Sequence, residues 1–319
     1  MRVHVTSAGS DPATALHCQR FHDLAAMDVH GRHQLEPDAE RADAIVFADV
    51  NLHRRTDPHG APRADLFRRF PERCFSYEVG DVPMYTLPGV YVSARRQWLT
   101  RLPVLGGPYI RTVTQMPPAS QEPSLLYSFR GSPSSRLRRR VLALNDPRAK
   151  IEAGQGPWDP GTAATEVAIG QVRHIDLIQR SKFVLCPRGQ GPSSHRIFET
   201  LAAGRVPVII SDKWVPPPRL DWERGSVRVA ERDIARIPEI LAATEARWPE
   251  LAAGASCLAH EFSDAHMWDH VMESIATVTA RPRPARPPFS IRALVLTRRT
   301  WLAAGPLRAR LRERLQAGI

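Results

Sequence analysis

Two arginines and a glutamate stand close together in the stretch 181–211, which reads SKFVLCPRGQGPSSHRIFETLAAGRVPVIIS. Arg188 follows an apolar run, and Arg196 and Glu199 lie three residues apart in a helical pattern, hence on nearly the same face. A helix N-terminus attracts anions, and guanidinium groups add charge-assisted hydrogen bonds to phosphate. A carboxylate would repel a diphosphate but would accept hydrogen bonds from ribose hydroxyls. The spacing is therefore compatible with a nucleotide diphosphate site, and equally with an exposed Arg196–Glu199 salt bridge beside a simple glycine turn.

A strand, a loop and a helix are needed to position these side chains. The run KFVLC predicts a strand, and the loop PRGQGP contains Gly189 and Gly191, which permit positive φ and close backbone approach. Ser193 or Ser194 can cap the following helix, Gly204 can end it, and VPVIIS predicts the returning strand. In an open α/β sheet, ligands bind beyond the carboxyl ends of the strands, and this loop lies there.

Strand and helix patterns alternate along the chain, which predicts parallel sheets with crossover helices. Strands are expected at residues 2–6, 42–49, 73–79, 89–93 and 124–131, helices at 12–27, 135–145 and 172–181, and a strand followed by a helix at 225–244. The segment PPASQEP at 117–123 reads as an interdomain linker. We therefore expect an N-terminal domain at 1–120, a C-terminal domain at 121–280, and a Pro-rich spacer with a basic helix at 281–319.

The formal net charge of +11 does not by itself indicate a nucleic-acid partner. Only three of the 44 basic residues are lysines, which is typical of GC-rich codon usage, and the basic residues are spread along the chain. The start MRVHVTSAGSDP lacks the apolar core of a signal peptide, and no apolar run approaches the roughly 18 residues of a membrane span. These features favour a soluble cytoplasmic protein that binds no nucleic acid.

No metal site is expected from the cysteines or histidines. The four cysteines are far apart and form no CxxC pair, and His260, His266 and His270 have no recognised zinc spacing. The basic segment at 290–316 could form a helix that lies on an anionic membrane surface, at the inner face of the membrane, or one that packs back on the body.

The stretch around 181–241 resembles the C-terminal signature of exostosin-like glycosyltransferases, glycosyltransferase family 47. The resemblance rests on four motifs: SHRIFE at 194–199, GRVPVI at 204–209, DW at 221–222 and ERDI at 231–234. It is close over about 60 residues and looser over 124–241, where YSFRGSPSSRLR resembles the family's first donor-domain strand. Many relatives carry an N-terminal membrane anchor, and this sequence shows none, so we expect a soluble member of a bacterial type.

The resemblance implies a GT-B fold, with two Rossmann-like domains facing a cleft. It implies an inverting transferase that uses a nucleotide diphosphate sugar, usually a UDP-sugar, and a glycan or lipid-linked glycan acceptor, without a metal or other cofactor. By the same resemblance Arg196 faces the diphosphate, Glu199 faces the ribose, and Ser132 and Arg136 reach phosphate from the first loop. Arg188 is placed near phosphate by geometry alone. The residues expected at the donor are Ser132, Arg136, Arg188, Gly189, Ser194, Arg196 and Glu199.

Inversion needs a general base on the acceptor side. Glu78 and Asp81 follow a predicted strand in SYEVGDVP, and the alternative for each is a solvated loop or turn side chain. Two other enzyme readings stay open, a GDP-fucose-type GT-B transferase and a nucleotide-sugar epimerase. A non-enzyme reading is a catalytically silent GT-B domain that assists a partner transferase.

Overall fold

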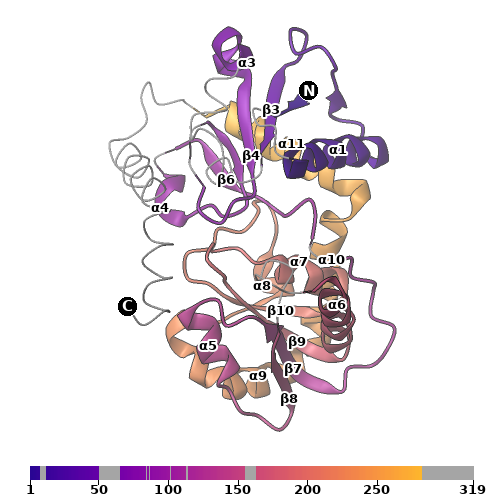
Figure 1. The fold of residues 1–319 in the computed structure, drawn as a ribbon, viewed down its shortest axis with the longest axis vertical. Coiled ribbons are helices and arrows are strands. Elements are labelled where there is room, and N and C mark those ends of the chain that lie inside the picture. Colours follow the sequence, from indigo (N-terminus) through magenta and orange to yellow (C-terminus); the bar gives the residue numbers. More distant parts are fainter. Residues whose placement is uncertain are drawn as a thin grey trace.

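Two parallel β-sheets, one above the other, make up the body of the protein in its computed structural model (Figure 1). The structure describes residues 1–7, 12–49, 65–83, 85, 87–100, 102–112, 114–154 and 163–281. The expected Pro-rich spacer and basic C-terminal helix therefore lie outside the described residues, apart from Arg281. No helix within the described ranges is long and apolar enough to span a membrane.

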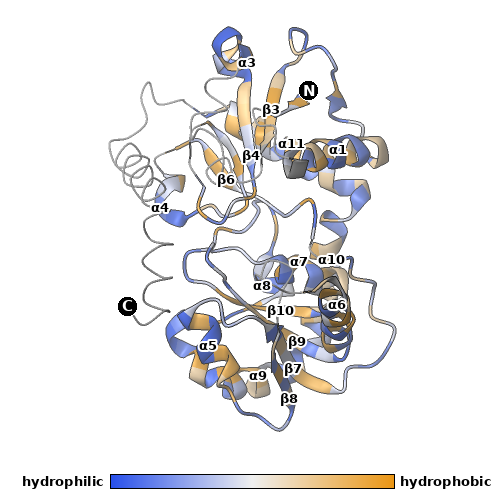
Figure 2. Ribbon diagram, viewed as in Figure 1, coloured by the Kyte–Doolittle hydropathy of each residue, from blue (hydrophilic) through white to orange (hydrophobic). Residues whose placement is uncertain are grey.

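The N-terminal sheet has six strands in the order β2-β1-β3-β4-β5-β6, and every pair is parallel. Its strands are β1 (Arg2–Thr6), β2 (Gln34–Leu35), β3 (Ala44–Asp49), β4 (Cys74–Glu78), β5 (Gly89–Tyr91) and β6 (Val104–Gly106). Its helices are α1 (Pro12–Met27), α3 (Asp65–Arg69), η1 (Pro71–Arg73) and α4 (Arg96–Leu99). Strand β3 is hydrophobic along most of its length (Figure 2), and every residue of β4 is buried, as a sheet covered on both faces requires.

The C-terminal sheet has five parallel strands in the order β11-β10-β9-β7-β8. Its strands are β7 (Leu125–Gly131), β8 (Ala149–Ala153), β9 (Ser181–Pro187), β10 (Val206–Ile210) and β11 (Val227–Arg228). The helices that follow them are α5 (Arg136–Leu142), α6 (Ala164–Gln179), α7 (His195–Ala202), α8 (Trp222–Gly225), η2 (Glu231–Arg236), α9 (Ile237–Thr244), η3 (Glu245–Arg247) and α10 (Trp248–Glu261). Gly204 has φ 68° directly after α7, the left-handed conformation expected of a helix-ending glycine.

Two parallel α/β sheets of this kind agree with the GT-B fold that the family resemblance implies. The long apolar strands fall within one or two residues of their predicted bounds, whereas β2 and β6 are too short to leave a pattern. The open sheet order of each half also gives each domain a point where the order of strands reverses.

The last described helix, α11 (Asp264–Thr279), returns to the N-terminal sheet. Figure 1 shows it beside α1, and it also packs against β5 and β6. Trp268 is fully buried there, donates its indole N–H to the carbonyl of His33 at 3.0 Å, and packs edge-on against Phe21. The sequence-based division assigned this stretch to the C-terminal domain. An amphipathic pattern shows that one face of a helix is buried, but it does not show which sheet the helix packs against.

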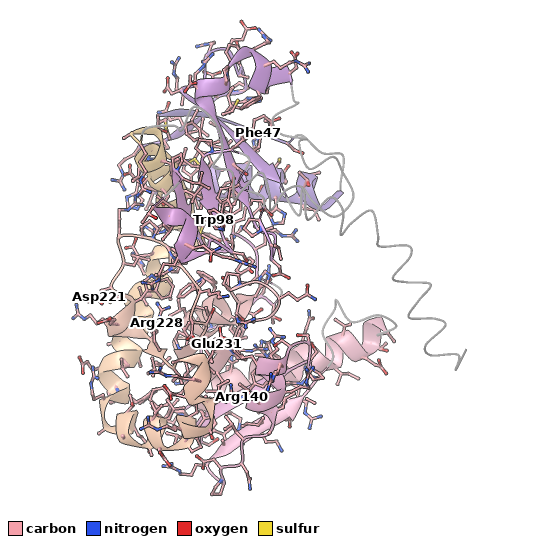
Figure 3. The ribbon with its side chains drawn as sticks, turned by 90° about the vertical axis from the view of Figure 1, so that its left-hand side faces the viewer. Phe47, Trp98, Arg140, Asp221, Arg228 and Glu231 are labelled. Atoms are coloured by element: carbon pink, nitrogen blue, oxygen red, sulfur yellow. The ribbon has the colours of Figure 1, made fainter. Side chains whose placement is uncertain are left out.

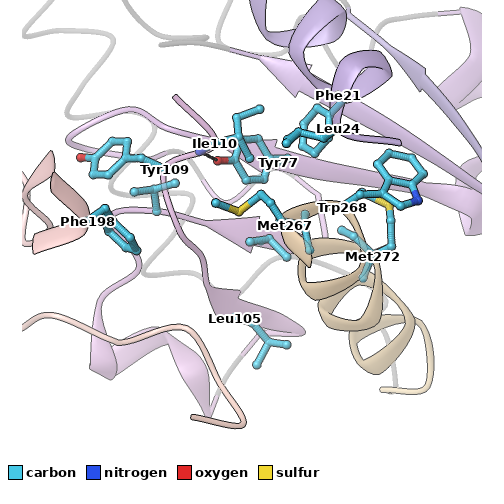
Figure 4. Close-up of a cluster of buried hydrophobic side chains, with 14 of the residues drawn as sticks. Phe21, Leu24, Tyr77, Leu105, Tyr109, Ile110, Phe198, Met267, Trp268 and Met272 are labelled. Atoms are coloured by element: carbon cyan, nitrogen blue, oxygen red, sulfur yellow. Dashed lines mark hydrogen bonds between the residues drawn. The ribbon is translucent and has the colours of Figure 1, made fainter. Parts of the chain in front are cut away.

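One hydrophobic cluster joins the two halves near this helix. It contains Phe21 and Tyr77 from the N-terminal domain and Phe198 from α7 of the other domain, with Met267 and Trp268 from α11 (Figure 4). Because burial of apolar area stabilises by about 25 cal/mol per Å², a shared core of this kind resists separation of the domains.

Candidate active site

The two loops predicted to bind phosphate lie next to each other at the carboxyl edge of the C-terminal sheet. Strands β7 and β9 are hydrogen-bonded neighbours although β8 lies between them in sequence, so the order reverses here. Ligands of open α/β sheets bind outside such a switch point. The loop after β7 carries Ser132 and leads to Arg136, and the loop after β9 carries Gly189 and leads to Ser194.

Arg196 occupies the centre of this region from the first turn of α7. Its side chain is buried, Nη2 donates to the carbonyl of Arg130, and the guanidinium lies over the Phe129 ring at 4.8 Å. A Cβ at Gly131 would come 3.2 Å from Nη2, so glycine there leaves the guanidinium room beneath the loop. Burial lowers the pKa of Arg196 below its usual range. Its Nε–H is buried and has no acceptor among the described residues, which is costly for a charged group and leaves a donor for a ligand.

Glu199 lies one helical turn further and is also buried. Its Oε1 accepts from the backbone N–H of Thr114 at 3.0 Å, and its Oε2 is 3.0 Å from Nε2 of His174 on α6. Burial raises the pKa of this carboxyl, but the His174 hydrogen bond and the charges of His174 and Arg196 outweigh it and hold the pKa below its usual range. The exposed Arg196–Glu199 salt bridge is thereby excluded, because both side chains are buried and each has other partners. Contact with ribose stays a prediction for Glu199.

The side chain of Arg188 forms an ion pair with Glu231. Its Nε and Nη2 donate to the two carboxylate oxygens of Glu231 at 2.7 and 3.0 Å, which raises the pKa of Arg188. Glu231 and Asp212 also exchange hydrogen bonds, each carboxylate accepting from the other's backbone N–H at 3.3 and 3.0 Å. This network ties the loop after β9 to the loop after β10 and to the start of η2. Arg188 therefore shapes the loop, with its charge already balanced.

The other predicted donor residues surround Arg196 at different depths. Arg136 is exposed at the first position of α5, Ser132 is half-buried, and Ser194 is the N-cap residue of α7 without a capping hydrogen bond. Gly189 lies beside Arg138, whose Nη2 would be 3.5 Å from a Cβ at 189. Sequence reasoning missed Arg138, although its position in the first turn of a basic helix after a Ser-rich loop was a usable signal.

Glu78 and Asp81 stand on the N-terminal side, at the carboxyl end of β4. Glu78 is buried, and its Oε1 accepts from the backbone N–H of Gly80 at 2.6 Å. Asp81 reaches the opposite domain, because a Cβ at Gly191 would lie 2.7 Å from its Oδ1 and 2.8 Å from Oγ of Ser93. Only glycine fits at 191, and the carboxyl-end loops of the two sheets meet at this contact.

Comparison with known families finds a similarity over part of the chain. Residues 108–244 match the model of the Exostosin GT47 domain. This segment, less than half of the chain, is similar to that domain. Glu78 and Asp81 lie outside the matched segment, whereas every residue expected to bind the donor lies inside it.

Curated relatives match the chain over short stretches. The Exostosin-1 homolog of Caenorhabditis elegans is 46% identical over 74 residues, which are 23% of this chain and 19% of that protein. The probable beta-1,4-xylosyltransferase IRX10 of Arabidopsis thaliana is 41% identical over 70 residues, 21% of this chain and 17% of that protein. The chain thus aligns with less than a fifth of the length of these relatives.

Solved structures of low sequence identity resemble the chain over most of its length. TarM has a TM-score of 0.40 at 11% identity, covering 76% of this chain and 51% of that one. Anabaena Alr3699/HepE in complex with UDP-glucose has a TM-score of 0.38 at 12% identity, covering 86% and 99%.

Beside the loop after β9, an aromatic pair spans the two domains. The rings of Tyr109 and His195 stack with centroids 3.6 Å apart and planes at 24°. Burial, and then the charge of Asp81, raise the pKa of Tyr109, while the hydroxyls of Ser193 and Ser93 oppose the shift. Sequence reasoning missed this pair, because nothing in the spacing of two residues 86 positions apart indicates a stack.

Two buried histidines predict an acid-sensitive fold. Burial lowers the pKa of His195 and of His270 to about 4, against about 6.5 for an unfolded histidine. Between these values the unfolded chain binds more protons than the folded one, so stability falls as the pH drops from 6.5 to 4, by up to about 3 kcal/mol per histidine. Urea denaturation at several pH values should show a shallower loss for His270→Phe than for the wild type. The exposed His22→Gln should keep the wild-type pH dependence, and an unchanged slope in His270→Phe would contradict the prediction.

Proposed function

We propose that the chain is an inverting glycosyltransferase that moves a sugar from a UDP-sugar to a hydroxyl group of a glycan. The observation that carries the proposal is the buried Arg196 guanidinium, which lies under Gly131 at the switch point and whose Nε–H has no acceptor among the described residues. Names of relatives support the activity class, among them a probable glucuronoxylan glucuronosyltransferase and a probable beta-1,4-xylosyltransferase of Arabidopsis thaliana.

In this proposal the diphosphate lies between the loop after β7 and the N-terminus of α7. The first backbone N–H groups of α7 and the guanidiniums of Arg196 and Arg136 neutralise its charge. As the bond from the anomeric carbon to the diphosphate breaks, these donors stabilise the negative charge on the leaving UDP. Protein cations thus supply the charge that a divalent metal supplies in other transferases. Glu199 accepts from ribose in addition to its present partners, since each carboxylate oxygen can accept two hydrogen bonds.

The acceptor is activated from the N-terminal domain. We propose Asp81 as the base, because it is less buried than Glu78 and touches the donor loop at Gly191. The acceptor oxygen attacks the anomeric carbon, its proton passes to the Asp81 carboxylate, and UDP leaves from the opposite face with inversion. Glu78 is the second candidate, with one oxygen held by the Gly80 N–H.

A thermal-shift panel of nucleotides and nucleotide sugars tests the donor, followed by an assay of UDP release with glycan acceptors. A ligand at 100 times its Kd adds about 2.7 kcal/mol of stability, so UDP and one UDP-sugar should raise the Tm clearly. Selective stabilisation by GDP-fucose would favour the fucose-type reading, and conversion of the sugar without acceptor would favour an epimerase. Binding without turnover would indicate a silent domain, and no stabilisation by any nucleotide would overturn the proposal.

A further inference from the structure

His174 on α6 is a nearly buried histidine that contacts Glu199 on α7. Its Nε2 lies 3.0 Å from Oε2 of Glu199, and 12% of the His174 side chain is exposed, against 4% for Glu199. Oε1 of the same carboxylate accepts from the backbone N–H of Thr114. A buried carboxylate is costly unless hydrogen bonds stabilise its charge. The two partners therefore hold both oxygens of Glu199 in place.

The inward face of α6 fixes the position of the imidazole. Gly170, His174 and Leu177 are four and three residues apart, so they lie on one face of the helix. Leu177 is buried, and its carbonyl accepts from the hydroxyls of Ser128 on β7 and Ser181 on β9. The helix is thus hydrogen-bonded to the two strands that meet at the switch point, and His174 projects from a rigid element.

The same face of α6 also supports the arginine side of the donor site. A Cβ at Gly170 would come 3.2 Å from Nη2 of Arg130, closer than an ordinary van der Waals contact, so glycine lets this guanidinium pack against the helix. The backbone carbonyl of Arg130 is the acceptor of Arg196 Nη2. One helix face therefore supports Arg196 through Arg130 and holds Glu199 through His174.

The charges around His174 make it a neutral hydrogen-bond donor. Burial lowers the pKa of His174, the Glu199 hydrogen bond opposes this shift, and the guanidiniums of Arg196 and Arg130 add to it, so the ring is neutral at pH 7. Glu199 is ionised, because its pKa lies below its usual range, and an ionised carboxylate can only accept. The hydrogen of the imidazole is therefore on Nε2, which donates to Oε2 of Glu199.

The second partner of Glu199 comes from the segment between β6 and β7. This segment joins the half of the molecule that contains Trp98 to the half that contains Glu231 (Figure 3). Thr114 donates there through its backbone, which every residue type except proline offers equally. His174 is thus the side-chain partner of Glu199, and a substitution can remove it without changing the course of the backbone.

We propose that His174 is a positioning residue for the donor, which holds the Glu199 carboxylate in place to accept hydrogen bonds from the ribose hydroxyls. The inference rests on the proposed glycosyltransferase function and deepens it. Each carboxylate oxygen can accept two hydrogen bonds, so Glu199 can bind ribose while His174 and Thr114 hold it. Without His174, burial would favour the protonated carboxyl, and the side chain would keep only the Thr114 contact.

Calorimetry with UDP, 2′-deoxy-UDP and 3′-deoxy-UDP tests this role. The wild type should bind UDP about tenfold or more tightly than at least one deoxy form, because a hydrogen bond to a charged group is lost. His174→Leu has no donor and should reduce this preference to about twofold or less. His174→Gln can still donate from Nε2 and should keep most of the preference. Val172→Gln, at an exposed position of the same helix, should bind all three ligands like the wild type.

The preference for ribose distinguishes positioning from a merely structural role. A lower Tm in His174→Leu with an unchanged preference overturns the inference, and so does a wild type that binds UDP and both deoxy forms equally. His174→Met, which also lacks a donor, gives the same measurement should His174→Leu not fold. Absence of UDP binding in the wild type counts against the transferase itself, so the two failures are distinguishable.

Discussion

Arg196→Lys is expected to lower kcat/KM for the donor by about 10²–10³-fold, the range found when one preorganised donor to a developing anion is removed. Lysine keeps the positive charge but loses the planar fork, so it cannot both hold the Arg130 carbonyl and present a second N–H to phosphate. The buried position over Phe129 leaves a shorter, more strongly hydrated ammonium poorly placed. The measurement is the rate of UDP release at varied UDP-sugar concentration, together with the Kd of UDP.

A structural role for Arg196 would give a different pattern. The Lys variant would then melt at a lower temperature, yet its folded fraction would bind UDP within twofold of the wild type. Arg236→Lys is the matched control, since Arg236 is exposed at the end of η2. Its ion pair with Glu239 is long, with Nε 3.9 Å from Oε2. We expect that control to keep wild-type kcat/KM and Tm. Unchanged UDP affinity in Arg196→Lys would remove this residue from the donor site.

The sequence predicted those parts of the site that depend on neighbours along the chain. The strand ending at Pro187, the loop with Gly189 and the helix carrying Arg196 form one continuous unit whose apolar runs and glycines are visible in the sequence. The same local logic predicted Gly204 at the end of α7. Such features need only hydrophobic periodicity and backbone preferences, which a single sequence contains.

Contacts between distant segments could not be predicted in this way. Glu199 is hydrogen-bonded to Thr114 and His174, which lie 85 and 25 residues away in the sequence. The sequence pattern indicated only the nearby Arg196 as a partner. The packing of α11 against α1, β5 and β6 depends on an apolar surface built from residues far away in the sequence. Arg188 illustrates the same limit, because its charge is neutralised by Glu231, 43 residues further along. Patterns locate candidate side chains, but their partners decide whether a charge is free to meet a ligand.

Asp81→Asn is expected to lower kcat by about 10²–10⁴-fold, the usual contribution of a positioned general base. Asparagine has nearly the shape of aspartate, so the close contact with Gly191 should persist while the proton acceptor is lost. UDP affinity should therefore stay within twofold of the wild type, because the donor loop is not changed. The measurement is the single-turnover rate with saturating donor and acceptor across a range of pH. In the wild type the rate should fall at low pH as the base is protonated, and this fall should be absent from Asp81→Asn.

The companion variant Glu78→Gln decides between the two carboxylates. Glu78 is buried and accepts from the Gly80 N–H, so it orients the turn that carries Asp81, and we expect a loss below tenfold with the pH profile retained. A large loss in Glu78→Gln together with near-wild-type turnover in Asp81→Asn would assign the base to Glu78. The distinction is physical, since a base must contact the acceptor hydroxyl, whereas a positioning carboxylate acts through the backbone it holds. The contact with Gly191 places Asp81 against the loop after β9, and for that reason the larger effect is assigned to Asp81.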